Sequence, residues 1–280
     1  MKKDAVKYII IIFLLVSANL YSRDNLQMQY EYAVQLYNSR QYYDAITEFK
    51  RLIFFDSAKK YIYNANEYIG LSYKMGAKFS DAILYFTVAE INAVNNDEIF
   101  ASKIDIIRAN ILRRTTQRAI TLLDTLQNDK RFNNRTGEIN YWKGWAYIFE
   151  DRWDDAAKSF GTADSNKALV ELCNKVQHDK YSVPFAEIIS HFIPGSGQIY
   201  TGHYASGLLS LGWNVLWGYI TVNAFAAGRV FDGLVVGNFL WLRFYNGNLQ
   251  NAGKFVKEEN LKITNNAMDY LQSSYHGLKP

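Results

Sequence analysis

The stretch YIGLSYKMGAKFSDAILYF, residues 68–86, decides the fold class. Its small and aromatic residues return at intervals of three and four, which is the spacing of one face of an α-helix. A related stretch, YWKGWAYIFEDRWDDAAKSF, occupies residues 141–160, and its central Glu150-Asp151-Arg152 is a short polar turn. We therefore predict two helices joined by a short turn in each stretch.

The pattern repeats every 37 residues. An alanine marks each unit, with fixed positions twelve and nine residues before it and a large apolar residue four after it. In chain order the four sets are Ala33, Leu36, Ala45 and Phe49; Gly70, Tyr73, Ala82 and Phe86; Ile107, Asn110, Ala119 and Leu123; and Gly144, Tyr147, Ala156 and Phe160. Small residues let paired helices approach closely, and a single pair cannot bury its own apolar face. We predict an all-α solenoid of four helix pairs over residues 24–178.

These positions resemble the tetratricopeptide repeat (TPR) family over residues 26–165. The third unit, with Ile107 and Asn110, departs from the family pattern, and the period exceeds the usual repeat of about 34 residues. The resemblance implies a groove, lined by the first helix of each unit, that binds a peptide or helix of a protein partner. By phase, the expected groove residues are Tyr30, Tyr37, Glu67, Lys74, Arg108, Tyr141 and Trp145. The alternative for the tyrosines is that they pack between repeats.

The N-terminus predicts export. Lys2, Lys3 and Lys7 precede the apolar run 8–16, and the small residues Ser17 and Ala18 follow it. This is the order of a secretory signal peptide, which we place at residues 1–22, with an uncleaved signal anchor as the alternative. The expected location is therefore a bacterial cell envelope, with the solenoid in the periplasm.

Composition excludes several classes. The net charge of +4 over 280 residues is too small for a strong polyanion-binding field, and export also argues against a nucleic-acid partner. The single cysteine, Cys173, cannot form an internal disulfide, and we expect it to be buried. The basic segment 103–135 is interpreted as a solvated helix face; contact with an acidic lipid surface or partner is the alternative.

The glycine-rich stretch IPGSGQIYTGHYASG, residues 193–207, does not match a phosphate-binding or hydrolase motif. Tyr200 stands where a dinucleotide-binding loop needs its third glycine. A P-loop needs a lysine after its glycines, and no lysine occurs from residue 181 to residue 253. Pro194 and Gln198 stand where a nucleophile elbow around Ser196 needs its two glycines. A metal site from Glu187, His191 and His203 has little support from the spacing. We expect no enzymatic activity, cofactor or metal.

The run 204–228 contains 25 residues without a charge, and a second apolar segment covers 230–245. A bilayer core needs about 20 apolar residues, so the first run predicts a membrane span. The stretch and its two segments resemble the TM-two-like membrane hairpins, through Pro194, Gly195, Gly197, Gln198, Tyr200 and Gly202. The resemblance implies a tight turn at the membrane surface, and a transmembrane or membrane-associated helical hairpin over 182–255. The alternative is a buried glycine-rich hairpin in a soluble domain, and residues 256–280 are expected to be an amphipathic or disordered tail.

Together these features predict a non-enzymatic scaffold of the cell envelope. The groove would bind a protein partner, and the hairpin would anchor the chain in the lipid of the inner membrane. The alternative is a membrane-active component that assists protein insertion or transport through polar hairpin residues, namely Asn214, Asn223, Asp232, Asn238 and Arg243.

Overall fold

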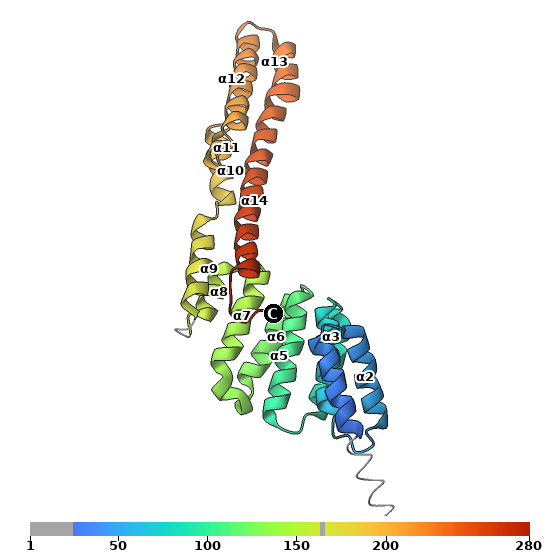
Figure 1. Cartoon of the computed structure of the whole chain (residues 1–280). Coiled ribbons are helices and arrows are strands. Elements are labelled where there is room, and N and C mark those ends of the chain that lie inside the picture. The colour runs from blue at the N-terminus through green and yellow to red at the C-terminus, as the bar shows by residue number, and fades with distance from the viewer. Residues whose placement is uncertain (1–24, 163–165) are drawn as a thin grey trace, which may run out of the picture. The chain divides into compact units, whose positions relative to one another are not determined.

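A computed structural model describes residues 25–162 and 166–280, and every regular element in these ranges is helical (Figure 1). The prediction of an all-α fold is confirmed. The expected signal peptide at 1–22 lies outside the described residues. The chain divides into two compact units: the first reaches Lys167 and also includes Leu278–Pro280, and the second is Ala168–Gly277. The boundary falls inside the range 24–178, so that α9 (Lys167–Asp179) groups almost entirely with the second unit.

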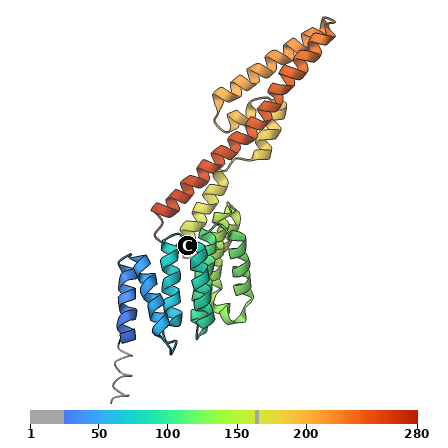
Figure 2. The same ribbon diagram turned by 90° about the vertical axis from the view of Figure 1, so that its right-hand side faces the viewer.

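The first unit consists of four successive helical hairpins, which lie side by side in a row (Figure 2). The first hairpin pairs the helix over residues 25–38 with α2 (Tyr42–Phe55). The others pair α3 (Ile62–Met75) with α4 (Phe79–Asn92), α5 (Asn96–Leu112) with α6 (Thr116–Asn128), and α7 (Thr136–Phe149) with α8 (Trp153–Phe160). A short 3-10 segment, η1 (Lys130–Arg135), precedes α7.

The 37-residue period is visible in the backbone of the turns. One non-glycine residue in each turn has a positive φ, between 55° and 63°, and these residues are Arg40, Ala77, Arg114 and Asp151. The amide of the next residue donates a hydrogen bond of 2.9–3.0 Å to a carbonyl five residues back, on Leu36, Tyr73, Asn110 or Tyr147. The same turn therefore closes all four hairpins, although left-handed backbone is unfavourable for residues with a Cβ atom.

The repeated positions form the core of the first unit. All four alanines of the repeat, and the apolar residues that follow them, are fully buried. A Cβ atom added at Gly144 would lie 2.5 Å from the ring of Phe160, and one at Gly70 would lie 2.5 Å from Phe86. Each glycine therefore leaves room for the aromatic ring on the second helix of its own hairpin. The sequence pattern instead predicts a close approach between the glycine and the alanine of the repeat.

The third hairpin replaces this contact with polar chemistry. Asn110 is buried, and its side-chain amide donates to the carbonyl of Ile106 at 2.8 Å. Its Oδ1 accepts a hydrogen bond of 2.8 Å from the hydroxyl of Thr115, in the turn. A buried amide is tolerated only when it is hydrogen-bonded, and here the neighbouring turn supplies the partner.

The second unit is built on α14 (Leu242–Ser273), a helix of 32 residues. The short helices α10 (Val183–Phe192) and α11 (Ser196–Tyr200) pack against it. The long α12 (Tyr204–Ala226) turns at Gly228, which has a φ of 74°, and pairs with α13 (Val230–Val236). A π-helical segment, η3 (Gly237–Trp241), connects α13 to α14.

Within residues 25–162 and 166–280, no helix combines the length and the apolar character that crossing a bilayer requires. This finding corrects the prediction of a membrane span in the run 204–228. The run has no charged side chain, but glycine, serine, asparagine and threonine recur through it and lower its hydropathy.

Candidate functional site

Four ionisable side chains meet on the first helices of the second and third hairpins. Glu67 and Lys74 lie on α3, Asp105 and Arg108 lie on α5, and we call these residues the charged cluster. Arg108 Nη1 donates to Asp105 Oδ1 at 2.8 Å, and the hydroxyl of Ser102 donates to Glu67 Oε1. Three of the residues expected in the groove, Glu67, Lys74 and Arg108, are therefore brought together.

Burial sets the ionisation of the charged cluster. Loss of solvation raises the pKa of Glu67 to about 7, and the hydrogen bond from Ser102 only partly opposes this rise. Burial, together with the nearby positive charge of Arg108, lowers the pKa of Lys74 to about 8. The pKa of Asp105 is raised by burial, against the opposing effect of Arg108 and Lys74. The cluster therefore changes its charge within about one pH unit of neutrality.

Aromatic rings flank the charged cluster. The guanidinium of Arg108 lies over the ring of Trp142, 4.9 Å from its centroid. Tyr141 meets Trp142 edge-on at 5.1 Å between ring centroids, and it meets Phe160 in the same way at 5.6 Å. Asp105 and Trp142 therefore both restrict the orientation of the Arg108 guanidinium.

The chain's own C-terminal residues contact this surface. Arg108 Nη2 donates to the main-chain carbonyl of Lys279 at 3.0 Å, and the hydroxyl of Tyr141 donates to the carbonyl of Leu278. Both contacts lie within the first unit, because Leu278–Pro280 belong to it. A short, non-helical peptide segment is thus held through its main chain.

The other expected groove residues have different surroundings. Tyr30 stacks on Tyr61 at 5.2 Å between ring centroids and belongs to the apolar core of the first two hairpins. Tyr37 packs against Tyr68 at 5.2 Å, and its pKa is raised mainly by burial, with a smaller effect from Asp105. These two tyrosines therefore make the contacts that the alternative interpretation, packing between repeats, predicts.

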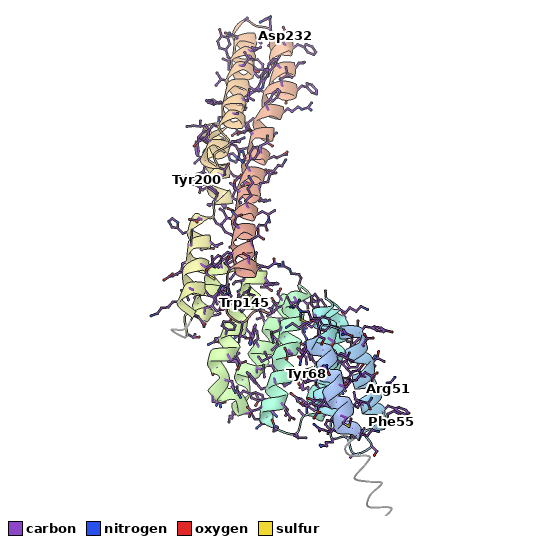
Figure 3. All side chains as sticks on the ribbon, in the orientation of Figure 1. Arg51, Phe55, Tyr68, Trp145, Tyr200 and Asp232 are labelled. Atoms are coloured by element: carbon purple, nitrogen blue, oxygen red, sulfur yellow. The ribbon has the colours of Figure 1, made fainter. Side chains whose placement is uncertain are left out.

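Trp145 departs from the expectation of an exposed aromatic anchor. Its side chain is 2% exposed and meets the ring of Phe160 edge-on, inside the first unit (Figure 3). Trp145 therefore supports Tyr141 from within the core, since both residues contact Phe160. Replacing a buried tryptophan with alanine costs roughly 3–5 kcal/mol, so the effect would be on stability first.

Sequence reasoning missed Asp105, Ser102 and Trp142. Asp105 lies three residues before Arg108 on α5, a spacing that places both on one helix face, so helical spacing alone could have identified it. Trp142 lies 37 residues after Asp105, so the period of the repeat places it at the equivalent position of the fourth hairpin and could have identified it.

The glycine-rich motif packs inside the second unit around Asn248 of α14. Asn248 is 2% exposed, and its Oδ1 accepts hydrogen bonds from the amide of Gly195 at 2.7 Å, from Gln198 Nε2 at 3.1 Å and from the hydroxyl of Ser210 at 2.9 Å. Its own amide group donates to the carbonyl of Ser190 at 3.1 Å. One asparagine thereby joins α10, α11 and α12 to α14.

Two glycines of the motif are required by this packing. Gly195 has a φ of 93°, and a Cβ atom there would lie 2.0 Å from the carbonyl oxygen of Gly207. A Cβ atom at Gly197 would lie 2.5 Å from the hydroxyl oxygen of Ser190 and 2.7 Å from Ala252. These two glycines therefore allow α11 to pack closely against α10, α12 and α14.

The remaining motif residues lie in the same region. Pro194 precedes Gly195 and is half-buried, while Gly202 has a φ of 83° in the turn between α11 and α12. Tyr200 packs edge-on against Tyr181 and Phe185, each at 5.1 Å between ring centroids. Figure 3 labels Tyr200 in this part of the second unit.

The hairpin of α12 and α13 carries many exposed apolar side chains. The hairpin surface is formed by Tyr204, Leu208, Leu209, Trp213, Val215, Leu216, Tyr219, Val222, Phe225, Val230, Phe231, Leu234, Val235 and Phe239, all at least 38% exposed. Its charged residues are confined to the end, where Arg229 and Asp232 pair at 3.7 Å (Figure 3). Contiguous apolar surface of this kind marks a site that contacts lipid or another protein.

The residues considered for a metal site do not converge. His191 Nδ1 pairs with the carbonyl of Glu187 at 2.8 Å, whereas His203 Nε2 lies 3.2 Å from Glu259 and its ring stacks on Phe255. Across the described residues, no group of three or more His, Cys, Asp and Glu side chains could hold an ion. Cys173 is buried, and burial raises the pKa of its thiol to about 12, which leaves it unreactive at neutral pH.

Comparison with known proteins gives no match: no family model, curated protein or solved structure is similar to this chain.

Proposed function

We propose that the protein is a non-enzymatic adaptor of the bacterial cell envelope. In this proposal the four helical hairpins are a TPR-like solenoid that binds a protein partner, and the α12–α13 hairpin holds the chain at the inner membrane. The expected signal peptide supports export, and the two compact units support a division of labour between binding and attachment.

One observation carries the partner-binding role. Arg108 and Tyr141, on the first helices of two successive hairpins, bond to consecutive main-chain carbonyls of a non-helical segment. Main-chain recognition of an extended peptide, together with aromatic side chains nearby, is how many peptide-binding surfaces work. The surface that holds Leu278 and Lys279 therefore has the chemistry needed for a partner's peptide.

The hairpin surface supports attachment to lipid. Its apolar side chains run along α12 and α13, and the tryptophan Trp213 and the tyrosines Tyr204 and Tyr219 have the amphipathic character favoured at a membrane interface. The proposal is that the hairpin inserts its apolar side chains into the bilayer without a requirement for a spanning helix. Flotation with vesicles of phosphatidylethanolamine and phosphatidylglycerol tests this part.

The alternative, a membrane-active role for the polar hairpin residues, is favoured by one residue. Asn214 is buried, and its Oδ1 has no hydrogen-bond partner. The other polar residues are less suggestive: Asp232 pairs with Arg229, and Asn238 donates to the carbonyl of Leu234 in its own segment. Asn214 and Arg243 line one pocket between α12 and α14, but Asp232 and Asn238 do not line it. Because the polar residues do not all share one site, we prefer the adaptor role.

Site-specific photocrosslinking in native membranes tests the partner-binding role. Benzoylphenylalanine replaces Lys74 in the charged cluster, or, in the control, Arg118, which is exposed on the second helix α6. The proposal predicts that position 74 captures a defined protein and that position 118 does not. Capture at position 74 should also decline when Arg108 is changed to alanine. Equal capture at both positions, or capture that is indifferent to Arg108→Ala, would contradict the proposal.

A further inference from the structure

The last three residues of the chain are separated in sequence from the unit that they join. Residues 168–277 form the second unit, yet Leu278, Lys279 and Pro280 group with the helical hairpins of the first. Residues 275–277 link this tail to the end of α14, and they are not helical. The tail is therefore a short peptide on a short tether, placed on the surface that we propose for a partner.

Two of the contacts that hold the tail are made to its main chain. Arg108 and Tyr141 donate to carbonyl oxygens, and the side chain of Leu278 is 69% exposed. Lys279 and Pro280 are half-buried at this surface. Because carbonyl groups occur in every peptide, these donors would serve equally well for an extended segment of another protein.

The donors are also held by contacts that do not involve the tail. Arg108 is held by Asp105 on one side and by the ring of Trp142 on the other, and the ring of Tyr141 is packed against Phe160. Side chains that are already ordered lose little freedom on binding, which favours even a short ligand.

We propose that residues 278–280 are a built-in competitor, and that a partner's extended peptide binds through its main-chain carbonyls to Arg108 and Tyr141 only after the tail leaves. This inference rests on the proposed function, because it takes this surface as the one that binds the partner. The tether keeps the tail at an effective concentration on the order of millimolar, so a partner binds more weakly to the full chain than to a chain without the tail.

The tail's own peptide is the probe. A fluorescein-labelled peptide of residues 271–280, LQSSYHGLKP, is titrated with the full chain and with a chain that ends at Gly277, and its anisotropy is measured. The chain that ends at Gly277 should bind the peptide at least roughly tenfold more tightly than the full chain does, as expected for removal of a tethered competitor. A Leu278→Ala peptide should bind equally well, because the leucine side chain is exposed.

Two arginine variants of the shortened chain supply the matched comparison. Arg108→Ala should weaken peptide binding at least tenfold, whereas Arg118→Ala on α6 should leave it unchanged. Urea unfolding of each variant shows that the hairpins are intact. Equal binding by the full and shortened chains, or no binding by the shortened chain, overturns the proposal.

A second measurement uses the full chain. Benzoylphenylalanine in place of Leu278, whose side chain is exposed, keeps Arg108 and Tyr141 and should crosslink within a single chain to a peptide of α5 or α7. A crosslinked dimer or the absence of this product overturns the intramolecular contact. These results are independent of the partner. If the shortened chain binds the tail peptide more tightly than the full chain does, and position 74 captures no protein in membranes, only the proposed function is contradicted. If position 74 captures a protein and the tail peptide does not bind, only the competitor proposal fails.

Discussion

Arg108 Nη2 lies 3.0 Å from the carbonyl oxygen of Lys279, 171 residues further along the chain. The same guanidinium bonds to Asp105 and covers the ring of Trp142. The side chain of Arg108 therefore contacts Asp105 of the charged cluster, the ring of Trp142 and the main chain of the C-terminal residues.

Substitution by alanine should have opposite effects on stability at two glycines of α7, Gly144 and Gly137. Gly144→Ala should lower stability by about 1–3 kcal/mol, because the new methyl group would lie 2.5 Å from the ring of Phe160. Gly137 has no atom near its Cβ position, so Gly137→Ala should raise stability by a few tenths to about 1 kcal/mol through helix propensity. Urea unfolding followed by tryptophan fluorescence measures both. A stable Gly144→Ala protein would show that the glycine does not set the distance between these helices.

The left-handed turn residues predict a stabilising glycine. Ala77 has a φ of 55°, so Ala77→Gly should raise the free energy of unfolding by up to about 1 kcal/mol, because glycine adopts this conformation without a steric penalty. Ala101 is exposed within α5, and Ala101→Gly should lower stability by about 1 kcal/mol. If thermal unfolding shows both variants to be destabilised alike, the turn at residue 77 is not strained in the way described.

The charged cluster predicts a specific pH dependence. Burial raises the pKa of Glu67 from 4.5 to about 7 in the folded chain, so the folded state binds more protons than the unfolded state between these values. Stability from this group is therefore present below pH 4.5 and is lost as the pH rises to about 7. Lys74 acts in the opposite direction at higher pH: its pKa falls from 10.5 to about 8, so stability recovers between these values.

Glu67→Gln isolates the contribution of Glu67 to the pH dependence of stability. The difference in stability between the variant and the parent should be constant below about pH 4.5, and the variant should gain on the parent as the pH rises from about 4.5 to about 7. Urea midpoints at pH 4, 5, 6 and 8 give the comparison. A difference that stays constant across this range would mean that Glu67 titrates as an ordinary exposed carboxyl.

Asn248 is predicted to determine the stability of the second unit. Asn248→Ala leaves the buried amide of Gly195 without its acceptor, and an unsatisfied group of this kind costs about 1–3 kcal/mol. Gln198 Nε2 keeps the main-chain carbonyl of residue 248, at 3.2 Å, as an acceptor. Asn246, two residues earlier on α14, is exposed, and Asn246→Ala should change stability by no more than about 0.5 kcal/mol. Hydrogen exchange at the Gly195 amide reports the loss directly. Unchanged protection of that amide in Asn248→Ala would contradict the proposed network.

The repeat could be predicted from the sequence because its physics is local. Spacing along the chain identified the small and aromatic positions of each hairpin, and the same 37-residue spacing recurs in the left-handed turn residues. Glu67, Lys74 and Arg108 could be expected on one surface because all three lie on the predicted first helices of successive units. The burial of Trp145 could not, because it depends on how closely Phe160 of the following helix approaches.

The second unit was harder to predict because its key contacts are distant in sequence. Gly195 meets Asn248 across 53 residues, and no local pattern marks that asparagine. The run 204–228 differs for another reason: it lacks charged residues, but glycine and hydroxyl-bearing residues fill part of it and lower its hydropathy. The tail contact had no signal in the sequence, because donors to main-chain carbonyls place no requirement on the peptide's side chains.

The most direct test of the adaptor proposal is the dissociation constant between the chain that ends at Gly277 and the protein captured at position 74. Removing the tail ensures that only the partner competes for Arg108 and Tyr141. The account predicts that Arg108→Ala raises this constant at least roughly tenfold, which corresponds to about 1.4 kcal/mol, while Arg118→Ala leaves it unchanged. If the constant is the same for both variants and the parent, the partner does not bind through this surface and the central claim is contradicted.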